Sequence, residues 1–391
     1  MSVVTALLSE AQGLARRMTE WRRKIHRNPE VGRELPDTTE LVRAVLTDLC
    51  IPWRACGGGT IAVIGRPDEG RVLLRADMDA LPLEERSGLA FASENGASHS
   101  CGHDLHTAML LGAAVLLKRR EDDLAREVAL VFQPDEEGLT GALSMIEDGL
   151  LTPEPDCAFA MHVDPYSLDV GRLLIKRGTL MASCDRFTIS VEGRGGHGAH
   201  PDKAISPIPA ATAIVGAFSD LRGYEISPMS RSVLTIGFIH AGAAHNVIPS
   251  VCTFGGTLRM LDDGDREKIL RRMEETAQNT ARAYRCSASM ELEGGAPALR
   301  NDDRLVDATY DALREAFGEA RILPPREAPS MGSEDFAHVT SRVPSCYMTI
   351  GCRPPGTAEP LPLHNPSAVF DEGVLPMGAA VFAIAALGSS L

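Results

Sequence analysis

Short, almost continuously apolar segments alternate with helical patterns in the first half of the chain. The apolar segments are TIAVIG (60–65), VLLRADMD (72–79), EVALVFQP (127–134) and CAFAMHV (157–163). Residues 107–120 and 140–151 have the spacing of helices, and Thr107 is a plausible cap for the first of them. Apolar strands separated by helices are typical of a buried, mostly parallel sheet. We therefore predict an α/β fold whose central sheet is flanked by helices.

The middle of the chain changes to a β-α-β-β-α-β order. The predicted elements are 185–193, 206–221, 232–242, 251–261, 263–284 and 287–294. This order is that of the split βαβ unit, which makes a small two-layer α+β domain. The tail returns to a mixed pattern, with a helix near 302–317 and a strand at 345–351. The predicted organisation is one α/β domain, residues 1–181 and 295–391, interrupted by an inserted α+β domain at 182–294.

Charge and cysteine usage narrow the class of protein. The formal net charge of −14 argues against unaided binding to nucleic acid or to an anionic membrane. The chain starts with the pattern of a helix, not of a signal peptide, and no apolar run approaches the roughly 18 residues of a membrane span. Nine scattered cysteines are typical of a reducing compartment. We expect a cytoplasmic protein without nucleic-acid or membrane partners.

Polar clusters follow the predicted strands directly. Asp77 and Asp79 follow VLLRA, Glu136 and Glu137 follow VALVFQP, and His162 follows CAFAM. In open parallel sheets, ligands bind in the crevice at the carboxyl ends of the strands. These clusters are therefore expected to lie close together, although they are far apart in the sequence.

The segment SHSCGHDLHTA (98–108) adds a thiol and imidazoles just before a predicted helix. Cys, His and Glu are ordinary ligands of zinc and related divalent ions. In an extended loop, Cys101 and His103 would point the same way, whereas the neighbours Glu136 and Glu137 would diverge. One glutamate could then bind a metal while the other faces the reacting water as a general base.

The motifs that carry these residues occur in a characteristic order. They are HRNPEVG, RADMDALP, SCGHDLHTA, FQPDEEG, MHVDP, GRGGHGAHP, HNVIP, GSEDF and LHNP. Together they resemble the metal-dependent aminoacylase/carboxypeptidase family, and within it the branch of hippurate hydrolases and auxin-conjugate (indoleacetyl-amino-acid) hydrolases. The resemblance extends from residue 26 to residue 366. It implies a metal-dependent amidohydrolase that cleaves the amide bond of N-acyl amino acids.

The resemblance also implies a two-metal site and its residues. The positions that match metal ligands are Cys101, His103, Glu137, His162 and His364. Glu136 matches the general base that deprotonates the attacking water and later protonates the leaving amine. In this branch the thiolate of Cys101 would bridge the two ions. Zinc or manganese is the expected metal, and cobalt and nickel are further candidates.

The inserted domain matches the family's lid and dimerisation domain, so the resemblance implies a homodimer. His197 matches a residue that stabilises the oxyanion, in some members from the partner subunit. Asn246 matches a substrate-contacting residue, and Arg259 matches an arginine that binds the substrate carboxylate through two parallel hydrogen bonds. The alternative interpretations are that Arg259 is an arginine on the surface of a strand and that His197 is a loop histidine, each without a role in substrate binding.

The chain departs from the branch's usual CGHDGH and FQPAEEGGGGA. The new residues are Leu105, Asp135, Leu139 and Thr140. Asp135 would raise the pKa of Glu136. Where other branches have a ligand histidine followed by an aspartate two residues on, this chain has Asp77-Met78-Asp79, and only Asp79 is expected to orient a ligand. His99 and His106 are expected to have structural or supporting roles.

Three other functions remain open from the residues. Cys101 could be the nucleophile of a cysteine hydrolase. The chain could be a non-catalytic binding protein on an enzyme scaffold. It could also be a dipeptidase or small carboxypeptidase that uses the same metals.

Overall fold

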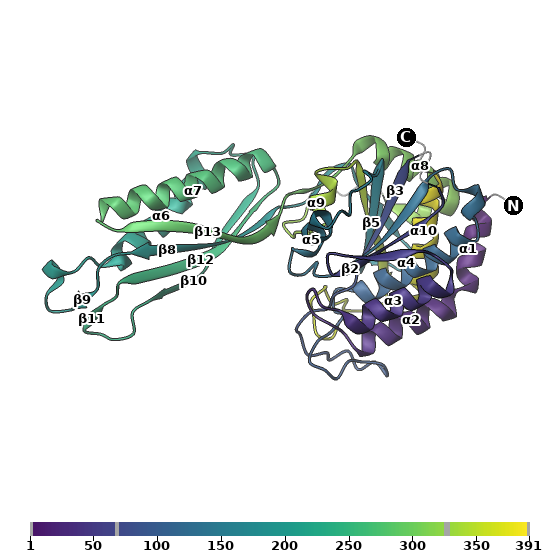
Figure 1. Cartoon of the computed structure of the whole chain (residues 1–391), viewed down its shortest axis with the longest axis horizontal. Coiled ribbons are helices and arrows are strands. Elements are labelled where there is room, and N and C mark those ends of the chain that lie inside the picture. Colours follow the sequence, from purple (N-terminus) through teal and green to yellow (C-terminus); the bar gives the residue numbers. More distant parts are fainter. Residues whose placement is uncertain (1–2, 67–69, 324–328, 389–391) are drawn as a thin grey trace. The chain divides into compact units, whose positions relative to one another are not determined.

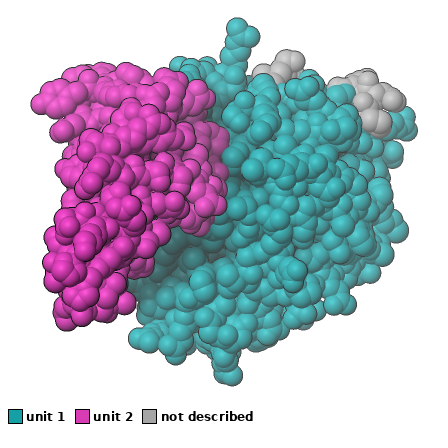
Figure 2. All heavy atoms as spheres, turned by 60° about the vertical axis from the view of Figure 1, so that its left-hand side comes forward, with its two compact units in different colours: residues 1–178, 300–328, 335–391 teal, residues 179–299, 329–334 magenta. Residues whose placement is uncertain are grey.

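The computed structural model describes residues 3–66, 70–323 and 329–388 (Figure 1). The largest sheet in this part of the chain has eight strands. Contacts divide the chain into two units, coloured separately in Figure 2. Unit 1 comprises residues 1–178, 300–328 and 335–391, and unit 2 comprises residues 179–299 and 329–334. The mixed α/β fold class predicted from the strand pattern is confirmed.

The sheet of unit 1 has the strand order β1-β2-β4-β3-β5-β16-β6-β15. Its strands are β1 (Trp53–Cys56), β2 (Gly59–Ile64), β3 (Arg71–Asp77), β4 (Glu127–Gln133), β5 (Cys157–Asp169), β6 (Leu173–Ile175), β15 (Ile322–Leu323) and β16 (Ser345–Arg353). The central strands β4, β3, β5 and β16 run parallel. On either side, β2 and β6 pair with them in the antiparallel sense. β4 is buried along its whole length, as a continuous apolar run requires in a sheet covered on both faces.

The helices of unit 1 pack around this sheet (Figure 1). They are α1 (Val3–Gly13), α2 (Ala15–Arg27), α3 (Pro36–Asp48), α4 (His103–Lys118), α5 (Gly141–Glu147), α8 (Asp303–Phe317), α9 (Ala337–Thr340) and α10 (Leu375–Gly388), with the 3-10 turns η2 (Glu121–Asp123), η4 (Glu319–Arg321) and η5 (Glu372–Val374). Of the helices that the structure describes, none is both long and apolar enough to cross a membrane.

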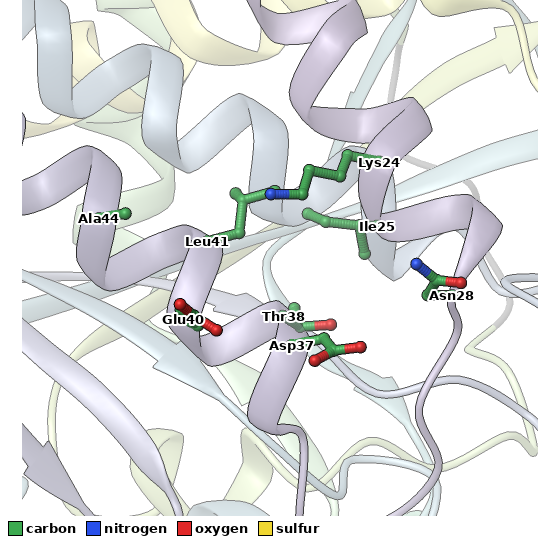
Figure 3. Close-up of a pocket in the computed structure, with 8 residues that line it drawn as sticks. All are labelled: Lys24, Ile25, Asn28, Asp37, Thr38, Glu40, Leu41 and Ala44. Atoms are coloured by element: carbon green, nitrogen blue, oxygen red, sulfur yellow. The ribbon is translucent and has the colours of Figure 1, made fainter.

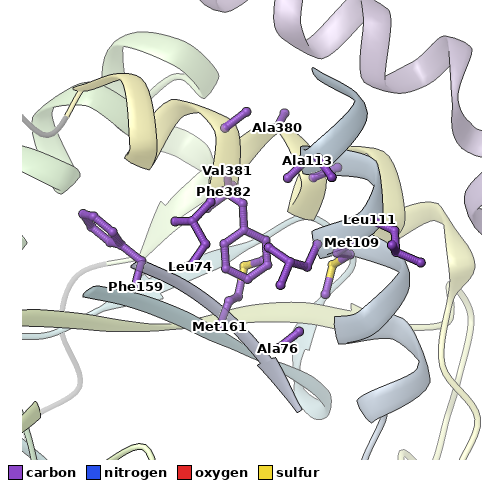
Figure 4. Packing of buried hydrophobic residues seen from close by; sticks show 14 of the residues in the cluster. Leu74, Ala76, Met109, Leu111, Ala113, Phe159, Met161, Ala380, Val381 and Phe382 are labelled. Carbon is purple, nitrogen blue, oxygen red and sulfur yellow. The ribbon is translucent and has the colours of Figure 1, made fainter. Parts of the chain in front are cut away.

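The core of unit 1 lies where α4 and α10 meet the central strands (Figure 4). Leu74 of β3 and Met161 of β5 pack there with Met109 of α4 and Phe382 of α10, and all four are buried. Burying a side chain of this size contributes about 1.5–3 kcal/mol. This packing fixes α4 on the sheet, and therefore fixes the residues at the start of α4.

Two predicted helix boundaries are wrong. α4 begins at His103, four residues before the predicted start, and the Thr107 hydroxyl donates to the carbonyl of Asp77 instead of capping the helix. Gly102 precedes the helix in a left-handed conformation with φ 86°, which most other residues avoid. α5 ends at Glu147, before the predicted end at residue 151.

Unit 2 has the predicted β-α-β-β-α-β order. The six elements are β8 (Cys184–Glu192), α6 (Pro207–Tyr224), β10 (Ser232–Ala241), β12 (Val251–Met260), α7 (Asp263–Ala283) and β13 (Ser287–Ala296). The sheet order is β10-β12-β8-β13, with every pair antiparallel. Phe187 and Phe254 of the sheet pack against Ile214 of α6 and Met273 of α7. Unit 2 also contains β9 (Gly196–His197), η3 (Pro201–Lys203) and β11 (Val247–Ile248). β7 (Gly178–Met181) and β14 (Leu299–Asn301) lie where the chain passes from one unit to the other.

Unit 2 also contains residues 329–334, which the sequence prediction placed with the first domain. The backbone N–H of Ala182 donates to the carbonyls of Ser330 and Gly332. Arg259 Nη1 donates to the carbonyl of Met331 at 3.0 Å. These contacts lie between segments distant in sequence, so the strand and helix pattern could not indicate them. The extents of the folding domains stay a prediction.

Candidate metal centre

The register of the central strands brings the predicted polar clusters of unit 1 to one edge. Asp77, the last residue of β3, lies opposite Gln133, the last residue of β4. Arg75 lies opposite Ala160 of β5, so two residues further on Asp77 and His162 reach the same level. The carboxyl ends of three parallel strands therefore present their polar side chains together, as the sequence predicted.

The segment that carries Cys101 and His103 is not a regular extended loop, because the residue between them has a left-handed backbone. The prediction that they lie in extended backbone is wrong, because Gly102 is left-handed and His103 starts α4. A Cβ atom at Gly102 would lie 2.4 Å from Cγ2 of Val163, in the strand that carries His162. Glycine is therefore required here both by its backbone conformation and by the close approach of β5.

We expect Gly102→Ala to lower the free energy of unfolding by about 2–4 kcal/mol, because a left-handed alanine is strained and its methyl group overlaps Val163. Urea unfolding of the metal-free protein measures this change. Gly96→Ala is the matched control, because Gly96 has φ 85° but open space around it. It should cost only about 1–2 kcal/mol, and equal losses in the two variants would contradict the packing argument.

The five predicted metal ligands come together in two overlapping groups. Ligand atoms of Cys101, His103 and His162 lie within 4.8 Å of one another, and so do those of Cys101, Glu137 and His364. The thiol of Cys101 belongs to both groups, which is the arrangement expected of a bridging ligand. A third group joins His103 to Glu136 and Glu137.

The hydrogen bonds of His162 leave one ring nitrogen available as a metal ligand. Its Nδ1 donates to the carbonyl of Val163 at 2.8 Å, because a carbonyl can only accept. The other nitrogen, Nε2, lies 3.4 Å from Sγ of Cys101. Burial lowers the pKa of His162 to about 3, which also favours the neutral ring that metals bind.

Asp79 connects three of the predicted site residues. Its Oδ1 lies 3.3 Å from Nδ1 of His103, and its two oxygens accept the backbone N–H groups of Glu136 and Glu137, each at 3.1 Å. The two glutamates lie in a turn closed by the N–H of Leu139 on the carbonyl of Glu136 at 2.7 Å. The prediction that they diverge from extended backbone is therefore wrong, although both side chains reach His103.

The electrostatics of the cluster favour cations. Burial opposes a charge on His103, yet Asp77 and Cys101 raise its pKa well above the usual value. Hydrogen bonds to Cys101 and Glu137 raise the pKa of His364 to about 10. The acidic groups thus draw positive charge into the site, as they would draw metal ions. His103 Nδ1 faces Asp79, whereas its buried Nε2 has no hydrogen-bond partner within the described part of the chain, which also fits a ligand role.

His364 lies on a loop that is bound to the segment carrying Cys101. Its backbone N–H donates to the carbonyl of Ser100 at 3.0 Å, and it adopts a left-handed conformation with φ 63°. Its Nε2 lies 3.2 Å from Oε1 of Glu137, while about half of the side chain is exposed. His364 is therefore the predicted ligand most open to solvent.

Two of the departures from the branch pattern are partners of each other. The Thr140 hydroxyl donates to Oδ2 of Asp135, and Arg33 Nη2 donates to the same hydroxyl at 2.9 Å. Asp135 and Leu139 both have left-handed backbones, with φ 55° and 58°. The turn that carries the two glutamates is thus closed by side chains. The effect of Asp135 on the pKa of Glu136 stays a prediction.

The three site residues predicted from the inserted segment all lie in unit 2. His197 lies on β9 and is exposed, and the N–H of Gly198 donates to the carbonyl of Asn246 at 2.8 Å, so these two predicted residues are neighbours. Arg259 lies on β12 and donates to the backbone of Met331. Their roles toward a substrate stay predictions.

Sequence reasoning missed a buried polar network behind the cluster. Arg75 donates to Asp77 at 2.8 Å, to Asp335 at 3.0 Å and to Gln133 at 2.9 Å, and all four side chains are buried. The available signal was an arginine inside the apolar strand VLLRAD, because a buried guanidinium needs acidic partners. The motifs FQP and GSEDF contain two of those partners.

A cavity of about 310 Å³ lies between α2 and α3 (Figure 3). Its lining residues are Lys24, Ile25, Asn28, Asp37, Thr38, Glu40, Leu41 and Ala44. None of these residues is a predicted ligand or base. Its lining does not contain the Cys, His and Glu constellation that catalysis with metals requires, so we do not assign the active site to it.

The mostly parallel sheet carries a Cys-His-Glu cluster at its carboxyl edge, which is the kind of donor set that metal-dependent hydrolases use. Residues 73–387, which include every predicted ligand, match the family model described as Peptidase family M20/M25/M40. The chain belongs to this family. The resemblance stated from the motifs is therefore confirmed, and so is the prediction of a hydrolase.

Relatives of known name agree with this assignment. An N-acetyl-L-cysteine deacetylase of Bacillus subtilis is 36% identical over 90% of this chain and 83% of its own length. A hippurate hydrolase of Campylobacter jejuni is 34% identical over 97% of this chain and 98% of its own length. The crystal structure of a dinuclear metal-binding M20 peptidase of Bacillus subtilis superposes with a TM-score of 0.79 and 32% identity, over 96% of this chain and 98% of that one.

Proposed function

We propose that the chain hydrolyses the amide bond of N-acyl amino acids, with two divalent cations held by Cys101, His103, Glu137, His162 and His364. The observation that carries this proposal is the membership of the Cys101 thiol in two ligand groups, with Glu136 beside them. The relatives named as a deacetylase of N-acetyl-L-cysteine and as a hippurate hydrolase support the substrate class.

Cations held by these residues would supply Lewis acidity toward a water molecule and the amide carbonyl. Glu136 accepts the proton of that water on its carboxylate, whose Oε2 lies 4.0 Å from Nε2 of His103. The same carboxyl group then donates the proton to the leaving amine. Asp79 keeps Glu136 and Glu137 in place through their backbone N–H groups. Glu137 serves as ligand, so one dipeptide supplies both a ligand and the base.

Unit 2 supplies the groups that recognise the rest of the substrate. We assign the amino-acid carboxylate to Arg259, because its guanidinium can donate two parallel hydrogen bonds. His197 stabilises the oxyanion, and Asn246, its neighbour through Gly198, contacts the substrate.

The donor set favours borderline-soft metals. A thiolate with imidazoles and a carboxylate is typical of zinc, and manganese is the second candidate; cobalt and nickel also suit imidazole ligands. Metal removal separates a Cys101 ligand from a Cys101 nucleophile, because a cysteine nucleophile would stay active without the metal.

A metal-depletion and substrate-panel experiment tests the proposed function. The chain is stripped with a chelator, reloaded with each metal, and assayed on N-acetyl and N-benzoyl amino acids, on their methyl esters and on dipeptides. We expect activity to disappear with the metal, to return on reloading, and to be highest on N-acyl amino acids with a free carboxylate. Full activity after complete metal removal would disprove the metal mechanism. A clear preference for dipeptides would instead identify a dipeptidase or small carboxypeptidase.

We further propose a homodimer formed through unit 2 in a reducing compartment such as the cytoplasm. β10 is an edge strand of the unit 2 sheet and exposes Val233, Phe238 and Ile239, and an unpaired strand edge can pair with a second copy of the chain. All nine cysteines are free, as in a reducing compartment. Sedimentation should give twice the chain mass of 41.9 kDa; a monomer at micromolar concentration would refute the dimer.

A further inference from the structure

His106 is buried beside the predicted ligands His103 and His162, yet both of its ring nitrogens are already bound within the protein. The backbone N–H of Val163 donates to its Nε2 at 3.0 Å, and its Nδ1 contacts Oδ1 of Asp77. A backbone N–H can only donate, so Nε2 carries no proton. Nδ1 therefore carries the proton and donates it to the carboxylate. No lone pair remains for a cation, although Asp77, His103 and His106 lie close enough to form a group.

Asp77 is occupied in the same way. Its Oδ1 accepts from His106, and its Oδ2 accepts from Arg75 Nη1 at 2.8 Å. Arg75, Asp77 and His106 are all buried, so the charge or dipole of each side chain is stabilised by the other two and not by water. The result is a continuous chain of donors and acceptors from Arg75 through Asp77 and His106 to the backbone of Val163.

The peptide group that ends this chain follows directly after a predicted metal ligand. His106 fixes the N–H of Val163, while the ring of His162 donates to the carbonyl of Val163. The N–H that His106 holds belongs to the peptide bond between His162 and Val163. The side chain of Val163 in turn packs so closely on Gly102 that a Cβ there would lie 2.4 Å away. The position of Val163 therefore affects two backbone segments: the one that follows His162, and the one at Gly102 between Cys101 and His103.

We propose that His106 is a positioning residue that holds His162, through the Val163 backbone, in the orientation that binds a cation. Arg75 and Asp77 fix the tautomer of His106 that can accept from Val163. This inference deepens the proposed metal-dependent function and rests on it. Supporting groups of this kind typically change metal affinity 10–100-fold when they are removed.

Two substitutions separate this role from a merely structural one. The amide oxygen of His106→Gln takes the place of Nε2 and can accept from Val163, whereas His106→Asn keeps only the contact with Asp77. Both are polar amides, so a general need for a polar residue would affect them equally. We expect His106→Gln to bind Co²⁺ within about threefold of the unmodified chain, and His106→Asn to bind it roughly 10–100-fold more weakly.

The readout is titration of the metal-free chains with Co²⁺, followed by the sulfur-to-cobalt charge-transfer band that Cys101 should produce. Unchanged binding by His106→Asn, or equal weakening in both variants, overturns the inference and leaves the proposed function standing. If the unmodified chain binds no Co²⁺, both are overturned.

A second measurement determines the protonation of the His106 ring directly. In proton–nitrogen correlation spectra of the metal-free chain with ¹⁵N-labelled histidine, the signals that are missing from His106→Gln should be those of a ring with an unprotonated Nε2 and a protonated Nδ1; His162 should give a second set of this kind in both proteins. A charged His106 ring, or a proton on Nε2, overturns the inference.

Discussion

Glu136→Gln should reduce kcat by roughly 10²–10⁴-fold while the protein keeps its full complement of metal, because loss of a general base has an effect of this size. The amide of glutamine has nearly the same shape as the carboxylate but cannot accept the proton of the water. Glu136 is buried, and its backbone is held by Asp79 independently of its side chain, so the turn should survive the substitution. Steady-state kinetics on an N-acyl amino acid, together with elemental analysis of the same sample, measures both quantities.

The neighbouring residue supplies the matched control. Glu137→Gln removes a negative charge from the same turn, one residue away, but it should lower the metal content because Glu137 groups with Cys101 and His364. The two variants thus predict opposite patterns, one with metal and no turnover, the other with reduced metal. Near-normal turnover in Glu136→Gln would remove Glu136 as the base, and the same metal loss in both variants would remove the division of roles.

Cys101→Ala should weaken the binding of both cations, since its thiol belongs to both ligand groups. Four-ligand zinc sites bind with about 10–16 kcal/mol, or about 3 kcal/mol per ligand, so losing one ligand should weaken each ion about 10²-fold. We expect the metal content to fall from two ions to one or none after dialysis, with a matching loss of activity. His364→Ala should affect only one of the two ions, because His364 belongs to one of these groups.

The control for Cys101 is Cys50→Ser. Cys50 is exposed and far from the cluster in sequence, and it is a free thiol like Cys101. It should keep both ions and full activity. If Cys101→Ala also retains two ions at wild-type affinity, the thiol is not a ligand. If Cys101→Ala loses activity while its metal content is unchanged, the result favours Cys101 as the nucleophile of a cysteine hydrolase.

Much of the fold could be predicted because its elements have strong local patterns. The continuous apolar run of β4 identified a buried strand, and the alternating pattern of β8 identified a strand covered on one face. The order of elements then fixed the split βαβ unit within a few residues. The predicted ligands could be brought together because strand ends of a parallel sheet meet at one edge.

The rest depended on contacts that no local pattern contains. The start of α4 at His103 follows from a left-handed Gly102 pressed against Val163, which belongs to a strand some sixty residues later. The predicted supporting role of His106 could not be specified, because its tautomer depends on a backbone N–H of β5. The turn that carries the two glutamates closes through Asp135 and Thr140, residues that looked like unrelated departures.

The proposed ligands of unit 1 come from both sides of the inserted unit in the sequence, with His162 before it and His364 after it. Cations bound to these residues would link the C-terminal part of the chain, which carries His364, to its first half. Ions that bind only the folded chain add stability in proportion to the logarithm of their concentration. A shortage of metal in the cell would therefore lower the stability of the fold as well as the activity, and the metal-free molecules would be the first to unfold and be degraded.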